Sequence, residues 1–501
     1  MRQLSSLDAQ FLDLESATTV GHVGAMVLLD PSTAPGGALT LDGLRAVLEP
    51  RLHLAPLLRQ RLVDIPFGLG RPYWADDPDF DLEFHLRELA LPGNGDEQEL
   101  GEQVARIHAR PLDRRRPLWE MYLVHNVSHG RSAVYSKVHH AAIDGVSGAE
   151  IVATIMDFTI EPGDVEAPDR PWSPEPVPSW VDLLGRGVTG AVRHPAALAK
   201  TVPRALPHLA ELPGAANIPG AQALSDLAVS VTKAFGGDDP RGDVERRPLR
   251  TPRTPLNVPI TAHRRFAFGA VPLDDVKRVK TAFAMTVNDV VMTLSTSALR
   301  GWLLDHDGLP DIPIVIAVPV SIRTDDEHGA NGNQLSVMLA EMPTHLADPR
   351  DRLLFVRDSM NQAKRQFEAV PASILKDLSA VLPTALNGLA GRALFRLLTV
   401  PGPPFNLFVS NVPGPQLPLY IGGARVLGVH PVSAVSDLTG ALNITLFSYD
   451  GDLDFGLIAC REVLPDAWNL IDYLRDALDE LVALPEVSGP AVPPAAPLAP
   501  T

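Results

Sequence analysis

Apolar and polar residues alternate along the first third of the chain in a pattern that predicts a β-hairpin followed by a helix. The segments 118–127 and 132–140 are rich in β-branched and aromatic residues, and the polar turn between them contains Gly130. In the next segment, 149–158, apolar side chains recur at helical spacing. The second strand therefore ends where the chain turns toward a helix, and such junctions hold functional side chains on rigid support.

The second half of the chain shows the same mixture of strand and helix patterns. We predict a helix over 285–304, a buried strand over 312–320 and a half-buried strand over 405–412. The segment 466–484 has the strongest amphipathic helical pattern, and its polar face is acidic. An acidic face favours a helix docked on a sheet over a helix that binds a membrane.

Changes of composition divide the chain into parts. Proline is dense from residue 161 to residue 178, the pattern from 179 to 236 is helical but interrupted by prolines, and the following residues are polar and rich in arginine. The C-terminal end is rich in proline and alanine, which is typical of disorder. The predicted parts are an N-terminal domain 1–160, a Pro-rich and helical linker 161–255, a C-terminal domain 256–485 and a disordered tail 486–501.

Composition and charge exclude several classes of protein. The 501 residues carry a formal net charge of -17, so we expect a globular protein that does not bind nucleic acid. Cys460 is the only cysteine, which excludes an intrachain disulfide and a thiolate cluster for zinc. The N-terminus does not resemble a signal peptide, and no apolar run reaches the about 20 residues of a transmembrane helix. We expect a cytoplasmic protein that is soluble or peripheral to a membrane.

The segment "KVHHAAIDGVSG" contains the main candidate for catalysis. His139 and His140 end the second hairpin strand, and Asp144 and Gly145 follow one turn later. Adjacent histidines at a strand end point to opposite sides and do not easily bind one ion, so no metal site is expected. The residues alone leave two interpretations open. Either one histidine is buried in the core while Asp144 caps the turn, or a histidine acts as general base while the carboxylate holds the turn in shape.

The heptapeptide "HHAAIDG" resembles the H-H-x-x-x-D-G signature of the CoA-dependent acyltransferase superfamily, which includes chloramphenicol acetyltransferase and peptide-synthetase condensation domains. Further motifs resemble, in the same order, those of the bacterial wax ester synthase/acyl-CoA:diacylglycerol acyltransferase family, in particular triacylglycerol synthases of the mycobacterial type. These motifs are "LSSLDAQFLDLE" (4–15), "GHVGAMVLLD" (21–30), "PLWE" (117–120), "TPLNVPITAHRRFAF" (254–268), "NDVVM" (288–292), "PVSIR" (319–323), "NGNQ" (331–334) and "SNVPGP" (410–415).

The resemblance implies an α+β fold of two chloramphenicol-acetyltransferase-like domains, each a mixed sheet with helices, joined by a partly helical linker. It implies an active site in a tunnel between the domains. The implied reaction transfers a long-chain acyl group from acyl-CoA to diacylglycerol, or to a fatty alcohol, by direct attack without an acyl-enzyme. Acyl-CoA is then a co-substrate and no cofactor is bound permanently. The alternatives are another lipid alcohol as acceptor, or a catalytically weak protein that binds lipid. The acceptor would be reached from a membrane or lipid-droplet surface, through the apolar faces of residues 179–236.

The resemblance also assigns roles to residues of the histidine motif. His140 corresponds to the general base and His139 to a supporting neighbour. Asp144 would be structural and paired with Arg323, and Gly145 would allow a close approach of the backbone.

Roles outside the histidine motif follow from the flanking motifs. Asn288 and Asp289 would brace the substrate pocket, although Thr286 and Asp289 also have the spacing of a helix-capping pair. Trp119 would be a packed structural anchor. Pro413 and Gly414 would shape a loop near the tunnel, or form a plain tight turn.

Overall fold

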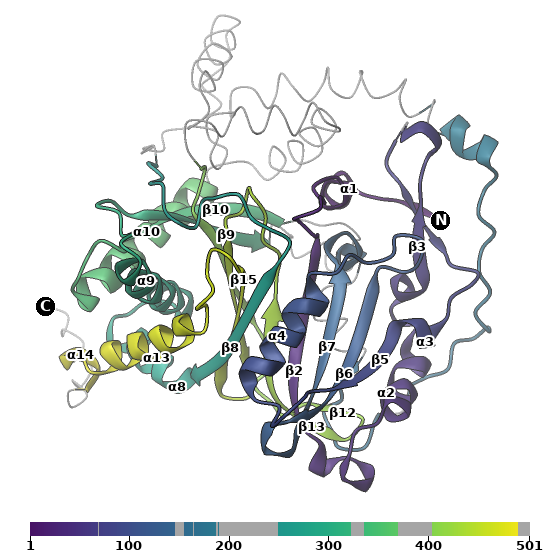
Figure 1. The fold of residues 1–501 in the computed structure, drawn as a ribbon, viewed down its shortest axis with the longest axis horizontal. Coiled ribbons are helices and arrows are strands. Elements are labelled where there is room, and N and C mark those ends of the chain that lie inside the picture. The colour runs from purple at the N-terminus through teal and green to yellow at the C-terminus, as the bar shows by residue number, and fades with distance from the viewer. Residues whose placement is uncertain are drawn as a thin grey trace, which may run out of the picture.

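The computed structural model describes residues 1–68, 70–145, 155–163, 165–186, 189, 249–321, 335–368 and 403–488. Two six-stranded sheets and one three-stranded sheet organise these residues (Figure 1). Both six-stranded sheets are mixed, because β5 pairs in parallel with β6 in one sheet and β11 with β14 in the other, whereas most other pairs are antiparallel. The predicted α+β class with mixed sheets and helices is confirmed.

Each sheet combines strands from distant parts of the chain. In spatial order, the N-terminal sheet contains β12 (Tyr420–Ile421), β13 (Ala424–Val432), β2 (His22–Asp30), β7 (Arg131–His139), β6 (Trp119–Val127) and β5 (Leu86–Ala90). The C-terminal sheet contains, also in spatial order, β10 (Leu335–Met342), β9 (Ile314–Ser321), β11 (Leu407–Pro413), β14 (Leu442–Tyr449), β15 (Asp452–Cys460) and β8 (Arg264–Pro272). The small sheet contains β1 (Arg2–Gln3), β4 (Tyr73–Asp76) and β3 (Gln60–Val63).

The described helices cover both sheets. They are α1 (Ser6–Asp13), α2 (Leu41–Leu48), α3 (Leu82–His85), α4 (Glu97–His108), α8 (Leu273–Ala282), α9 (Val287–Asp305), α10 (Pro349–Glu368), α13 (Asn469–Val482) and α14 (Pro485–Ser488). The helices α8, α9, α10 and α13 gather on the outer side of the C-terminal sheet, whereas α4 packs against β8 in the middle of the molecule (Figure 1). Among the described residues, no helix is both long and apolar enough to span a bilayer.

Most predicted elements are present. The hairpin is formed by β6 and β7 with a turn at Ser128–Gly130, and the strands and helices predicted in the second half correspond to β9, β11, α9 and α13. The helix α13 buries its apolar stripe against α9 and β8, as expected for a docked helix. The helix predicted over 149–158 lies largely outside the described residues. The domain limits remain predictions.

One strand of the C-terminal half belongs to the N-terminal sheet. The strand β13 pairs antiparallel with β2 over seven residue pairs, from Arg425 opposite Asp30 to Val432 opposite Gly24. The same strand contacts β15 of the other sheet. The core reflects this crossover, because a single apolar cluster contains side chains of both sheets, such as Met26, Phe266 and Leu457. The two halves are therefore connected by a shared sheet and a shared core.

Asp454 of β15 lies at the contact between the two sheets. Its side chain is almost completely buried, and its Oδ2 accepts a hydrogen bond of 2.6 Å from the backbone N–H of Val429 in β13. Burial raises the pKa of the Asp454 carboxyl to about 8, with a smaller contribution from Asp452, although the Val429 N–H opposes the shift. The carboxyl is thus mostly protonated at neutral pH.

Asp454→Asn should flatten the pH dependence of stability. In the folded protein the carboxyl keeps its proton up to about pH 8, whereas in the unfolded chain it ionises near about pH 3.9. The unfolded chain therefore binds fewer protons between these values, and the free energy of unfolding falls as the pH rises. Asparagine cannot ionise but keeps an oxygen that accepts from Val429. Urea unfolding of both proteins at about pH 5 and about pH 8 checks this. If the wild type and the variant lost the same free energy of unfolding between the two pH values, Asp454 would already be ionised in the folded protein.

Candidate active site

The predicted histidine motif lies at the end of β7, beside the beginning of β2. His139 is the last residue of β7 and pairs across the sheet with His22, the first residue of β2. His140 begins the short 3-10 helix η7 (His140–Gly145). The N–H of His140 donates a hydrogen bond of 2.7 Å to the carbonyl of Gly21, so the pairing of the two strands continues through the motif.

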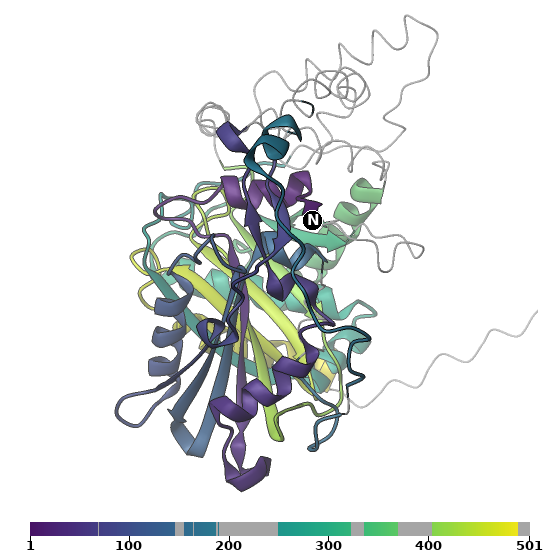
Figure 2. The ribbon, with the colours of Figure 1, turned by 90° about the vertical axis from the view of Figure 1, so that its right-hand side faces the viewer.

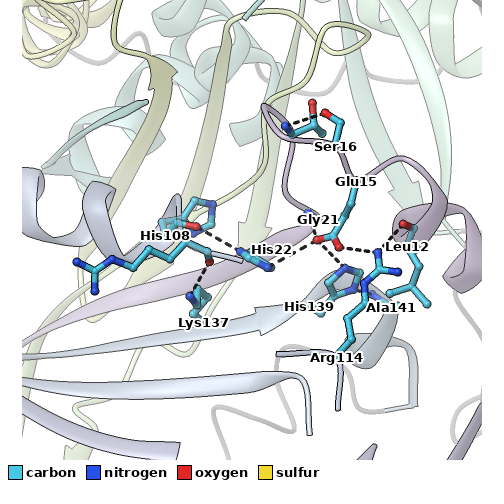
Figure 3. Close-up of polar contacts among 12 residues, drawn as sticks. Leu12, Glu15, Ser16, Gly21, His22, His108, Arg114, Lys137, His139 and Ala141 are labelled. Atoms are coloured by element: carbon cyan, nitrogen blue, oxygen red, sulfur yellow. Dashed lines mark hydrogen bonds and ion pairs between the residues drawn. The ribbon is translucent and has the colours of Figure 1, made fainter. Parts of the chain in front are cut away.

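Glu15 is the centre of the polar contacts around His139 (Figure 3). Its Oε1 lies 3.1 Å from Nε2 of His139 and 3.7 Å from Nε2 of His22, and it accepts the N–H of Gly21 at 3.0 Å. Its Oε2 accepts from Arg114 at 2.6 Å. The side chain is only 16% exposed, so these donors replace the water that a carboxylate would otherwise bind.

The contacts of His139 define its tautomer. Its Nδ1 accepts a hydrogen bond from the backbone N–H of Ala141 at 3.1 Å, so Nδ1 carries no proton. The proton of the neutral ring is therefore on Nε2, which faces the carboxylate of Glu15. Burial by itself raises the pKa of Glu15, but contact with His139, the Gly21 N–H and Arg114 outweighs it and lowers this pKa to about 2.

Further buried polar groups lie next to this pair on the side of α4. His22 Nδ1 lies 3.2 Å from the carbonyl of His108, the last residue of α4, and His108 Nδ1 lies 2.7 Å from the hydroxyl of Tyr135. The Lys137 ammonium donates to carbonyls at the same helix end, which favours a cation there. Burial, followed by the charge of Lys137, lowers the pKa of His22 to about 3. The ring of His22 is therefore neutral.

The side chain of His140 is partly exposed. Its ring stacks on Phe11 of α1, with the ring centroids 3.8 Å apart and the planes 14° from parallel. Its Nδ1 is buried and has no hydrogen-bond partner among the described residues. Burial lowers the pKa of His140 to about 4, although a backbone hydrogen bond and the negative charge of Asp8 oppose this shift. The imidazole is thus neutral near pH 7 and is able to accept a proton.

The remaining residues of the motif are only partly described. Asp144 and Gly145 lie in η7, one turn after His140, but the structure does not describe the Asp144 side chain. Arg323 lies outside the described residues, so the predicted pairing of Asp144 with Arg323 remains a prediction.

Asn288 and Asp289 lie in the first turn of α9, and their contacts are structural. Thr286 and Asp289 form the predicted capping box, in which Asp289 Oδ2 accepts the Thr286 N–H at 2.9 Å and the Thr286 hydroxyl accepts the Asp289 N–H at 3.2 Å. Asn288 Oδ1 accepts a hydrogen bond of 3.4 Å from Asn411 of β11. A role of these residues toward substrate remains a prediction.

Trp119 has the contacts of a structural anchor. It is buried, its Nε1 donates to the carbonyl of Leu58 at 2.8 Å, and its ring stacks on His85. Pro413 ends β11 and is exposed. A Cβ on Gly414 would lie 2.4 Å from the ring of Phe447, so only glycine fits there.

The implied tunnel remains a prediction. A cleft of about 910 Å³ lies between the N-terminal half and α13, lined by Asn94, Arg131, Trp468 and Arg475 among others. Arg131 begins β7 and His139 ends it, so at about 3.3 Å per residue this cleft is roughly 26 Å from the motif. Within the described parts of the chain, no group of three or more His, Cys, Asp or Glu side chains is placed to hold a metal ion.

Sequence reasoning missed Phe11, Glu15 and Gly21, which contact the motif, and Arg114, which contacts Glu15. Phe11 and Glu15 belong to the segment 4–15, which was informative only through its resemblance to a family motif. No spacing rule connects a carboxylate at position 15 with a histidine at position 139, since the contact arises from the pairing of β2 with β7.

Solved structures show which class of fold this is. The first condensation domain of the calcium-dependent antibiotic synthetase matches 98% of this chain and 99% of its own, with a TM-score of 0.51 and 16% identity. The wax ester synthase/diacylglycerol acyltransferase of Marinobacter aquaeolei VT8 matches 96% of this chain and 98% of its own, with a TM-score of 0.62 and 31% identity. The predicted two-domain fold of the chloramphenicol-acetyltransferase type is confirmed.

The sequence comparisons show the family. The wax ester synthase/diacylglycerol acyltransferase catalytic domain matches residues 4–291, and the C-terminal domain of the same family matches residues 331–482. A protein of Mycobacterium tuberculosis named as a diacylglycerol O-acyltransferase is 37% identical over 484 residues, which are 95% of this chain and 99% of that protein. One of Mycobacterium bovis with the same name is 33% identical over 482 residues, 95% and 97% of the two chains. The chain belongs to the wax ester synthase/diacylglycerol acyltransferase family.

Proposed function

We propose that the protein is an acyl-CoA-dependent O-acyltransferase that transfers a long-chain acyl group to diacylglycerol, with fatty alcohols as second acceptors. Family membership and the names of the mycobacterial relatives support the reaction class and the acceptor. A starter condensation domain of the same fold was solved with C8-CoA, which supports acyl-CoA as the co-substrate. The observation that carries the proposal is the state of His140, a neutral and partly exposed imidazole at the end of β7.

In the proposed reaction His140 acts as general base. Because Nδ1 is buried, we assign the proton transfer to Nε2. Nε2 takes the proton of the acceptor hydroxyl while that oxygen forms a bond to the thioester carbonyl carbon. The tetrahedral intermediate collapses, the C–S bond breaks, and the CoA thiolate leaves and takes up the proton from His140. The products are the ester and free CoA, and no acyl-enzyme is formed. Asp144 with Arg323 would hold the turn, and Asn288 and Asp289 would brace the pocket.

We also propose that the acceptor is reached at a lipid surface through an exposed aromatic tip, defined as Phe67, Trp180 and Val181. Their side chains are 80%, 57% and 68% exposed, and the rings of Phe67 and Trp180 contact each other edge to face. Phe67 has a φ of 59°, a conformation that is costly for a bulky residue. The helical residues 180–186 and α1, which contacts His140, lie toward the same end of the molecule (Figure 2). Exposed aromatic side chains of this kind insert at lipid–water interfaces.

His140→Ala should lower kcat by about 10²–10⁴-fold, the usual contribution of a general base. The measurement is thiol release from a long-chain acyl-CoA, first with diacylglycerol and then with hexadecanol as acceptor. The control is His125→Ala, which removes a surface histidine paired with Glu88 and should leave kcat unchanged. Full activity of His140→Ala would refute the general-base assignment. Absence of thiol release from the wild type with either acceptor would refute the reaction itself.

Replacing both rings of the aromatic tip with serine, in Phe67→Ser/Trp180→Ser, should reduce binding to vesicles that contain diacylglycerol. Loss of two aromatic side chains that insert into the lipid removes about 3 kcal/mol or more of apolar contact, which corresponds to at least about a 100-fold weaker partition. Flotation of the protein with vesicles measures the bound fraction. Phe158→Ser is the matched control, because Phe158 is 70% exposed and its neighbour Asp157 pairs with Tyr420 of β12, which lies at the opposite end of the molecule from residues 180–186 (Figure 1). Equal flotation of the double variant and the control would contradict this surface.

A further inference from the structure

We infer that Glu15 is a positioning residue for the general base, an inference that rests on the proposed role of His140. A single oxygen of Glu15 holds the two groups that fix the peptide units on either side of His140. Glu15 does not contact the reacting atoms in the proposed reaction. It acts through His139 and Gly21 on the backbone that carries His140.

The first connection passes through Gly21. Glu15 Oε1 accepts the Gly21 N–H at 3.0 Å, and the Gly21 carbonyl accepts the His140 N–H at 2.7 Å. The approach is close, because a Cβ on residue 21 would lie 2.9 Å from Nε2 of His139 and 3.0 Å from the carbonyl oxygen of Phe11. Glycine at this position lets the strand end, the carboxylate and α1 meet.

The second connection passes through His139. The same Oε1 faces Nε2 of His139 at 3.1 Å, and Nδ1 of that ring accepts the Ala141 N–H at 3.1 Å. The carboxylate favours the tautomer with the proton on Nε2, and only this neutral tautomer leaves Nδ1 free to accept. In the other tautomer the Nδ1–H of His139 would face the N–H of Ala141, and the turn after His140 would have to move.

The carboxylate is itself held in place. Arg114 donates to Glu15 Oε2 at 2.6 Å and to the carbonyl of Leu12 at 2.7 Å, which ties the acid to the end of α1. Phe11 in the same helix stacks on the ring of His140. The backbone and the ring of His140 are therefore positioned from one segment of the chain, residues 11–21.

Two conservative variants separate position from charge. Glu15→Gln keeps an oxygen at the same reach for Gly21 and His139 but loses the charge, whereas Glu15→Asp keeps the charge but shortens the side chain by one methylene. A positioning role predicts that Gln keeps kcat within about tenfold of wild type, while Asp loses about 10²-fold, since a shift of about 1 Å has that effect. The KM for acyl-CoA should not change in either. An electrostatic role predicts the reverse order and would overturn the inference.

The matched control is Glu102, whose Oε1 pairs with Arg265 at 2.7 Å and whose Oε2 pairs with Arg106 at 3.2 Å, so both carboxylate oxygens are engaged away from the histidine motif. Glu102→Gln and Glu102→Asp should leave kcat unchanged. In the His140→Ala background, Glu15→Asp should cost nothing more, because Glu15 acts through the residue already removed. A further loss of similar size in that background would show that Glu15 acts by another route.

A readout without turnover distinguishes this inference from the proposed function. In protein labelled with ¹⁵N-histidine, the ring nitrogens of His139 should show a protonated Nε2 and an unprotonated Nδ1 in wild type and in Glu15→Gln. In Glu15→Asp the two tautomers should mix. This result supports the inference even if the wild type released no thiol. A His139 tautomer that is identical in all three proteins would overturn it.

Discussion

The strand β2 is the constraint on which the site depends, because it is hydrogen-bonded to β13 on one side and to β7 on the other. The first contact brings a strand of the C-terminal half into the N-terminal sheet. The second places His22 opposite His139 and lets the pairing continue from Gly21 to His140. A shift of one residue in the register of β2 against β7 would turn the histidines to the opposite faces of the sheet. The connection between the halves and the geometry of the motif therefore have a common origin.

The charged groups beside this strand are buried, and each has a partner that makes burial tolerable. Glu15 has Arg114, the Gly21 N–H and the nearby ring of His139, and Lys137 has Glu120 at 3.3 Å and two carbonyls at the end of α4. A buried charge without such partners would cost several kcal/mol. The histidines nearby avoid that cost by remaining neutral, since burial lowers the pKa of His22 to about 3. His140 shares this property but is partly exposed, so its neutral ring is accessible to a substrate.

Much of the fold could be predicted from the sequence, because local periodicity determines local structure. The alternation around Gly130 predicted the hairpin, and the stripe of Ile471, Leu474 and Leu478 predicted α13. The crossover of β13 into the N-terminal sheet could not be predicted. The sequence pattern of β13 fits a strand of either sheet, and no local feature of the sequence identifies β2 as its partner. The flanking motifs identified the family, which the histidines alone would not have done.

The candidate site could be predicted only in part, for the same reason. His139, His140, Asp144 and Gly145 are adjacent in sequence, so their pattern is visible there. Glu15 contacts His139 across 124 positions, and such a contact exists only once β2 and β7 have paired. The capping box at Thr286 and Asp289 was predicted because both partners lie in one turn of helix.

The central claim is that the end of β7 holds His140 as a neutral base whose pKa is far below the usual value of a histidine. The most direct measurement is the pH dependence of kcat/KM for the acceptor alcohol at saturating acyl-CoA, because its acid limb reports the pKa of the base. The base is active only when unprotonated, so activity should be lost as the pH falls through the pKa of His140 in the folded protein. We predict an acid limb near about pH 4 instead of 6.5. A limb near 6.5, the ordinary pKa of a solvated histidine, would contradict the claim.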